Sequence, residues 1–208
     1  MGKTIDTMNS TGIVGRLIGA SITGYQFSCS REEMVIPQVG SLVSANLATG
    51  LRSYGVVCNI RWAADGLITQ LASSPTPAIE TGVLLDNQLL RTGGPVIDVA
   101  LVGYEDSNLV YGIPPLPPIT LELIWLCEST DFLRFTKSNG YLRLLIAATS
   151  PDIVAAHLQV AHQMHLHVGH TGWVRDAVDY LSGLLVSDGA TLSALAEAVA
   201  HRIPDHYF

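Results

Sequence analysis

Residues 15–27, with the sequence GRLIGASITGYQF, and residues 54–62, with the sequence YGVVCNIRW, decide the fold. Both stretches are rich in glycine and in β-branched or aromatic residues, which favour strands. Thr23 and Gly24 provide a turn between two strands of the first stretch. Recurring glycines supply the bends that a small closed barrel needs. The sequence therefore predicts strand pairs of a strongly curved barrel, and neither stretch carries a side chain suited to bond-making chemistry.

The same pattern continues through the first 127 residues. Six strands are predicted at about 12–20, 24–29, 41–47, 53–62, 96–104 and 119–127. Alternation along them places a set of apolar side chains inside the barrel: Val14, Leu17, Phe27, Val43, Val57 or Val56, and Ile124. We expect a flexible N-terminus at 1–11 and an insertion at the barrel rim at about 63–95. The proline run at 114–118 must be extended, and it leads into the last strand.

After Cys127 the apolar residues follow helical spacing. Ser129 or Thr130 is predicted to cap a first helix, and Ser150 followed by Pro151 marks the start of another. Further helices are predicted to begin at Thr171 and Thr191. The expected fold class is therefore α+β, with a six-stranded barrel at 12–127 followed by an all-helical domain at 128–208.

Composition limits the classes of function. Apolar residues make up 48% of the chain and charged residues only 14%, so we expect apolar surface to meet a protein partner or a second copy in a homo-oligomer. The net charge of −7 and scattered basic residues argue against direct nucleic-acid binding. We find no secretory signal and no apolar run of about 18 residues. Cys29, Cys58 and Cys127 are expected to be buried and reduced, and the protein cytoplasmic.

Four short motifs follow one another along the chain. They are GRLIGAS at 15–21, followed by Thr23 and Phe27, then GSLV at 40–43, YGVV at 54–57 and PPLPP at 114–118. In this order they resemble the HAS-barrel, which is shared by the HerA family of DNA-translocating ATPases and the N-terminal domains of rotary ATP synthase subunits. The chain is most similar to stand-alone bacterial HAS-barrel proteins with a helical C-terminal extension. The resemblance implies a barrel that docks to protein partners, and a HerA-like ATPase as a candidate partner.

No ATPase domain accompanies the barrel. The tripeptide Gly2-Lys3-Thr4 lacks the preceding strand and the earlier glycine of a phosphate-binding loop. We therefore expect no ATP hydrolysis and no cofactor. The leading hypothesis is a non-enzymatic adaptor, and the alternative from the same class is a regulator or assembly factor of another ring ATPase.

The enzyme alternative is a metal-dependent hydrolase that uses a histidine cluster. His162, His165, His167 and His170 lie within nine residues, and imidazole is a good ligand for zinc or copper. The cluster contains no cysteine or carboxylate and lacks the His-Glu-x-x-His spacing, so a helix interface with solvated neighbours is favoured over a metal site. Arg16, the one charge in the first motif, is expected to lie along the barrel with its guanidinium in water.

Overall fold

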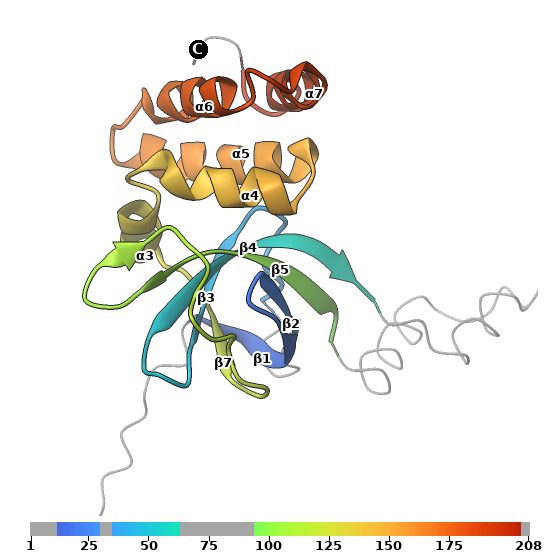
Figure 1. The fold of residues 1–208 in the computed structure, drawn as a ribbon, viewed down its shortest axis with the longest axis vertical. Coiled ribbons are helices and arrows are strands. Elements are labelled where there is room, and N and C mark those ends of the chain that lie inside the picture. Colours follow the sequence, from blue (N-terminus) through green and yellow to red (C-terminus); the bar gives the residue numbers. More distant parts are fainter. Residues whose placement is uncertain (1–11, 30–34, 63–93, 205–208) are drawn as a thin grey trace, which may run out of the picture.

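The computed structural model describes residues 12–29, 35–62 and 94–204, in which a β-barrel is followed by helices (Figure 1). The strands are β1 (Ile13–Ala20), β2 (Gly24–Cys29), β3 (Leu42–Asn46), β4 (Arg52–Arg61), β5 (Val96–Glu105), β6 (Leu109–Val110) and β7 (Leu123–Leu126). Every pairing is antiparallel, and the barrel closes in the order β1, β2, β5, β4, β3, β7 and back to β1. The short β6 pairs only with β5. The predicted α+β class with a six-stranded barrel is confirmed.

The last strand is shorter than predicted. β7 begins at Leu123, whereas the sequence placed its start at residue 119. Residues 119–122 instead form a turn in which the amide of Glu122 donates to the carbonyl of Ile119 over 3.2 Å. The other five strands agree with the predicted ranges to within one residue at each end. The predicted insertion lies outside the described residues except for Gly94 and Pro95, and the N-terminal segment lies outside them entirely.

Two apolar cores lie on opposite faces of the barrel wall. The interior core contains the predicted side chains of Val14, Leu17, Phe27, Val43, Val57 and Ile124, all of which are at most 2% exposed. Val56 points outward into a second core, which Tyr54, Ala100 and Val102 share with the helices. β4 at residues 53–57 and β5 at residues 99–103 are therefore buried on both faces.

Five α-helices follow the barrel within the described residues. They are α3 (Ser129–Phe135), α4 (Leu142–Ala148), α5 (Pro151–His167), α6 (Trp173–Leu184) and α7 (Gly189–Ala200), with a single 3₁₀ turn at Asn139–Tyr141. Figure 1 shows α4 to α7 stacked on the side of the barrel formed by β4 and β5, with α3 beside this stack.

Three predicted helix starts need correction. The N-cap of α3 is Glu128, and that of α6 is Gly172. The N-cap of α7 is Asp188, whose carboxylate accepts a hydrogen bond from the amide of Thr191 over 3.1 Å. Thr191 therefore does not cap the helix. It lies three residues after the N-cap, where its amide is within reach of the Asp188 side chain. The predicted start at Ser150 and Pro151 is confirmed, although the Ser150 side chain makes no capping bond.

A buried contact fixes α5 to the barrel. Nδ1 of His157 lies 2.7 Å from the carbonyl oxygen of Gly40, in the turn before β3, and Nε2 lies 2.7 Å from the hydroxyl of Tyr141. Because a carbonyl only accepts, Nδ1 carries the proton and Nε2 accepts from Tyr141. All three residues are buried. This contact sets the position of the helices relative to the barrel.

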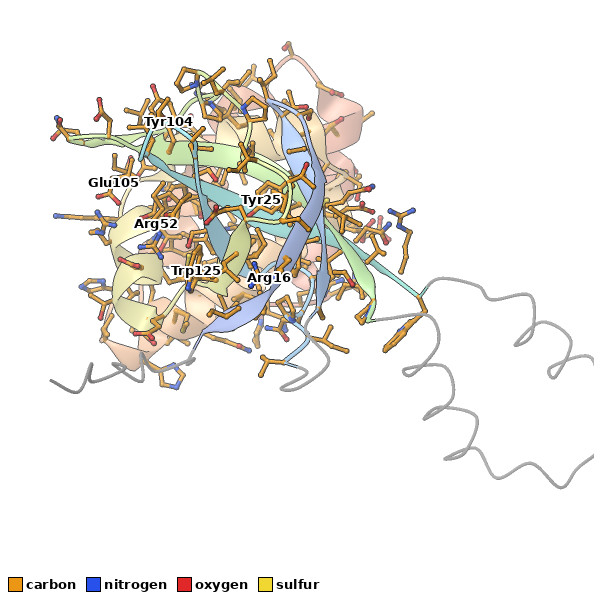
Figure 2. The ribbon with its side chains drawn as sticks, turned by 90° about the horizontal axis from the view of Figure 1, so that it is seen from below. Arg16, Tyr25, Arg52, Tyr104, Glu105 and Trp125 are labelled. Carbon is orange, nitrogen blue, oxygen red and sulfur yellow. The ribbon has the colours of Figure 1, made fainter. Side chains whose placement is uncertain are left out.

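A second contact, made of alternating charges, ties α3 to the barrel wall. Arg52 donates to Asp131 over 2.7 Å, and Arg134 donates to both Asp131 and Glu105. Arg134 and Glu105 also bond the Tyr54 hydroxyl, at 2.8 Å each. The hydrogen bonds from Arg134 hold the pKa of the Glu105 carboxyl at about 2. Figure 2 shows Arg52 and Glu105 on the same side of the barrel. The network is internally neutral, so it serves attachment and offers no free charge for a ligand.

Candidate functional site

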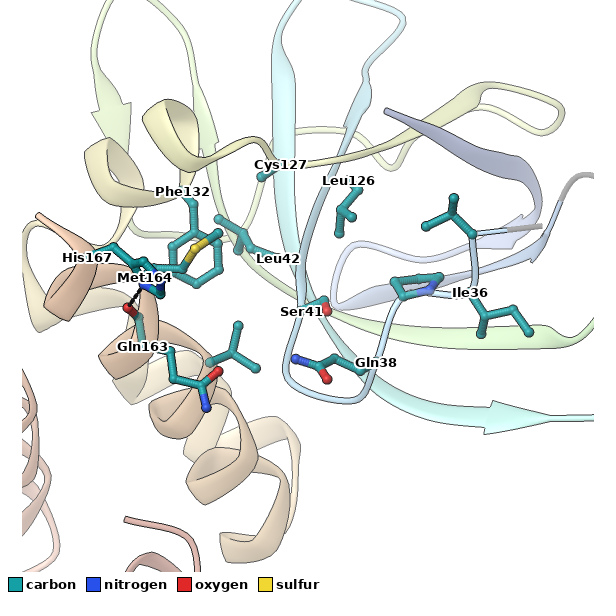
Figure 3. A pocket seen from close by; sticks show the side chains of 13 residues that line it. Ile36, Gln38, Ser41, Leu42, Leu126, Cys127, Phe132, Gln163, Met164 and His167 are labelled. Carbon is teal, nitrogen blue, oxygen red and sulfur yellow. Dashed lines mark hydrogen bonds between the residues drawn. The ribbon is translucent and has the colours of Figure 1, made fainter. Parts of the chain in front are cut away.

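A groove opens where the barrel meets α5 (Figure 3). It has a volume of about 390 Å³. One wall comes from the segment before β3 and the end of β7, and the other from α3 and one face of α5. Its lining residues, called the junction groove below, are Val35, Ile36, Pro37, Gln38, Ser41, Leu42, Leu126, Cys127, Phe132, Val160, Gln163, Met164 and His167.

The junction groove is poor in reactive groups. Among the described residues, none of the side chains that line it is Asp, Glu, Lys or Arg. Burial raises the pKa of the Cys127 thiol to about 12, so this cysteine is not a thiolate near neutral pH. Nδ1 of His167 lies 2.6 Å from the carbonyl oxygen of Gln163 within the same helix. The groove therefore offers shape and apolar contact, and no nucleophile paired with a base.

A second surface comes from β1 and the turn before β7, and Figure 1 shows β1 and β7 on the side of the barrel away from the helices. Ile18 on β1 and Ile119 and Leu121 in the turn before β7 are 46%, 51% and 64% exposed. These three side chains are called the barrel tip below. The amide of Leu121 donates to the carbonyl of Leu17 over 2.8 Å, so the turn continues the β1–β7 ladder and places Leu121 next to Ile18 in the fold.

Leu121 has an unusual backbone. Its φ is +69°, a left-handed conformation that costs a non-glycine residue about 1–2 kcal/mol. The guanidinium of Arg16 donates to the Leu121 carbonyl over 3.1 Å and braces the turn. Arg16 is exposed, as predicted, but it also makes this specific contact. Strained backbone that the surroundings hold in place is found preferentially at functional sites, and here it presents an apolar side chain to solvent.

The four candidate histidines do not form one site. His162 and His165 are 4% and 2% exposed, whereas His167 and His170 are exposed. The ring of His165 is stacked on Trp173 with centroids 4.6 Å apart, and its Nε2 lies 2.9 Å from the hydroxyl of Thr136. That hydroxyl donates to the carbonyl of Phe132, so Nε2 of His165 must be the donor.

His170 approaches the second ring nitrogen of His165. The two Nδ1 atoms are 3.4 Å apart, and the two rings are stacked. Burial, together with the neighbouring His170 and His162, lowers the pKa of His165 to about 4. Among the described residues, no group of three or more His, Cys, Asp or Glu side chains gathers closely enough to hold a metal ion.

We therefore expect that the purified protein contains substoichiometric zinc, copper and nickel by elemental analysis. Chelation should leave the melting temperature unchanged, because only a ligand bound to the folded state adds stability. The control is the His170→Ala variant, which should have the same metal content as the parent protein. Stoichiometric metal that is lost in this variant, together with several degrees of melting temperature, would revive the hydrolase alternative.

The cysteines and the proline run singled out in the sequence lie in structural positions. Cys29 and Cys127 are buried as predicted, whereas Cys58 is only half-buried, and all three are free thiols. In the proline run, Pro118 forms an isolated bridge with Leu47, beside the turn between β3 and β4. No helix within the described residues has the length and apolar character needed to cross a membrane.

Neither surface was predicted from the sequence. The junction groove unites residues from four separate segments, so no local motif could reveal it. The barrel tip left no signal either, since Ile119 and Leu121 continue the period-two alternation of residues 123 and 125. No protein-family model and no curated protein matches the chain. The HAS-type resemblance therefore stays a prediction.

Proposed function

We propose that this protein is a non-enzymatic adaptor that binds a protein partner through the barrel tip. The observation that supports the proposal is the exposed Leu121 side chain on a left-handed backbone. An exposed leucine in a strained conformation contributes little to the stability of the fold, which supports a contact of this side chain outside the chain. Ile18 and Ile119 extend the apolar contact, and Arg16 and Glu122 border it with one charge of each sign.

The rest of the architecture suits an adaptor. The barrel interior is filled by side chains and leaves the outer surface for binding. The buried contact of His157 with Gly40 and the Arg52–Asp131–Arg134–Glu105 network hold the helices on the barrel. A partner bound at the barrel tip would thus carry the helical region in a fixed orientation. The HAS-type resemblance points to a HerA-like ATPase as the partner, and a different ring ATPase is the alternative.

The test compares affinity capture from native cells by the parent protein and by Leu121→Glu. A charge in the centre of an apolar contact carries a desolvation penalty, so we expect at least about a tenfold loss of the captured ATPase. Val186→Glu is the matched control, because Val186 is 78% exposed and lies in the helical region. Both substitutions are at exposed positions and should change the free energy of unfolding by less than about 0.5 kcal/mol.

A second variant separates function from stability. In Leu121→Gly the left-handed backbone costs nothing, and this relief of about 1–2 kcal/mol offsets the entropic cost of a glycine. We expect a protein that is as stable as the parent in urea denaturation but captures the partner poorly. Capture by both Leu121 variants at the level of the parent protein would refute the proposal. If either variant instead converts an oligomer into a monomer in light scattering, the occupant of the barrel tip is a second copy of the chain.

A further inference from the structure

We infer that the junction groove is a binding site for a small, uncharged, mostly apolar molecule. The inference does not depend on the proposed adaptor role, because the groove lies between the end of β7 and the helices, while the barrel tip comes from β1 and the turn before the start of β7. Size, charge and the nature of the polar groups each restrict the occupant.

Size favours a small molecule over a helix of a partner protein. Small-molecule sites have volumes of about 300–1,000 Å³ and occur preferentially where structural units meet, and the groove has about 390 Å³ at such a junction. An α-helix with its side chains is about 10–12 Å across, so two turns would occupy roughly 900 Å³. A partner helix could therefore place only one or two side chains in this space.

Charge restricts the occupant further. The deep part of the groove is formed by Leu42, Cys127 and Phe132, which are at most 4% exposed. A carboxylate or ammonium group taken into this deep part would lose its hydration without gaining an opposite charge from the described lining residues, none of which is Asp, Glu, Lys or Arg. The occupant should therefore carry no net charge.

The few polar groups indicate how one end of the molecule would be held. Gln38 and Gln163 come from opposite walls and both are exposed, so their amides remain available as donors and acceptors (Figure 3). His167 donates from Nδ1 to the Gln163 carbonyl, which leaves Nε2 as the second polar atom of its ring. A hydroxyl or a neutral amide matches these groups. Half-buried Met164 and Val160 on α5 supply the apolar wall, and the flexible methionine can adjust to the shape of the occupant.

The experiment uses the full chain and the uncharged fluorescent probe N-phenyl-1-naphthylamine. We expect saturable binding of one probe per chain. Decanol should displace the probe, whereas decanoate at pH 8 should do so at least about tenfold less well, because its carboxylate finds no partner in the groove. Met164→Lys should weaken probe binding at least about tenfold. Val168→Lys, at the C-cap directly after α5, outside the groove and 50% exposed, should bind like the parent.

A second variant, which fills the groove, tests whether a loss of probe binding could come from misfolding. Val160→Phe reduces the groove volume without adding charge, and it should also weaken probe binding while the circular dichroism spectrum stays that of the parent. Unsaturable probe binding, or displacement by decanoate as strong as by decanol, would overturn the inference. So would unchanged affinity in folded Met164→Lys and Val160→Phe. If the groove holds only side chains of a partner protein, the isolated chain will not bind the probe, and the inference fails in that case too.

Discussion

Replacing Gly40 with alanine should lower the free energy of unfolding by about 3 kcal/mol. Two effects combine at this position. Gly40 has a φ of +91°, a conformation that side chains rarely adopt. A Cβ atom there would also lie 2.7 Å from the backbone carbonyl of Ala156 and 2.8 Å from the amide nitrogen of His157. Backbone atoms in the middle of α5 cannot move aside like the end of a flexible side chain, so the helix must shift away from the barrel.

Gly50 offers a matched control for this prediction. It also has a positive φ, of +80°, but a Cβ atom there would have no neighbour within 4 Å. Gly50→Ala should therefore cost only about 1 kcal/mol, the backbone part of the effect. For a chain of this size we expect the melting temperature to fall by about 10 °C in Gly40→Ala and by about 3 °C in Gly50→Ala. Equal losses in the two variants would mean that the close approach of Gly40 to α5 does not contribute to stability.

The barrel was predictable because its strands carry period-two alternation and its bends carry glycine. What the sequence could not decide was which of Val56 and Val57 faces inward. Both are fully buried, one in each core, because the helices cover the outer face of β4. Alternation reveals a strand's orientation only when one face meets water. A strand buried on both faces loses that signal.

The end of the proline run was mispredicted for a different reason. Apolar residues at 119, 121, 123 and 125 alternate as they would in a strand, yet the first two lie exposed in a turn. The left-handed backbone at Leu121 that makes this turn has no sequence signature, since leucine disfavours it. The barrel tip and the junction groove could not be predicted from the sequence for a further reason. Both bring together residues that are far apart in the sequence, so their assembly depends on the barrel's closure and on the docking of α5.

That docking should make the protein sensitive to mild acid. His157 is fully buried, and burial lowers its pKa to about 4, against the opposing effect of its hydrogen bond to the Gly40 carbonyl. In the unfolded chain the pKa of a histidine is about 6.5, so between these values the unfolded state binds the proton and the folded state does not. Stability should therefore be lost as the pH falls through this window. From pH 7 to pH 5 we expect a loss of about 2 kcal/mol from this imidazole.

Urea denaturation at pH 7, 6 and 5 measures the effect. His157→Gln should be less stable than the parent at pH 7, because it disturbs the bonds to Gly40 and Tyr141. It should nevertheless lose about 2 kcal/mol less than the parent between pH 7 and pH 5, since it has no proton to take up on unfolding. His201→Gln is the control, because His201 is exposed and bonds only the Glu197 carbonyl within its own helix turn.

The pH range in which stability is lost distinguishes His157 from the carboxylates. Glu105, with its pKa at about 2, contributes stability that is lost only below the ordinary range of a glutamate, near pH 4 and lower. The lowered pKa of His165 acts in the same window as that of His157, so the His157→Gln variant should keep part of the acid sensitivity. A parent protein whose stability is constant from pH 7 to pH 5 would contradict the neutral, buried state of His157. In that case the bond between α5 and the Gly40 turn would have to tolerate a charged imidazole, and the fixed orientation of the helices on the barrel would need another explanation.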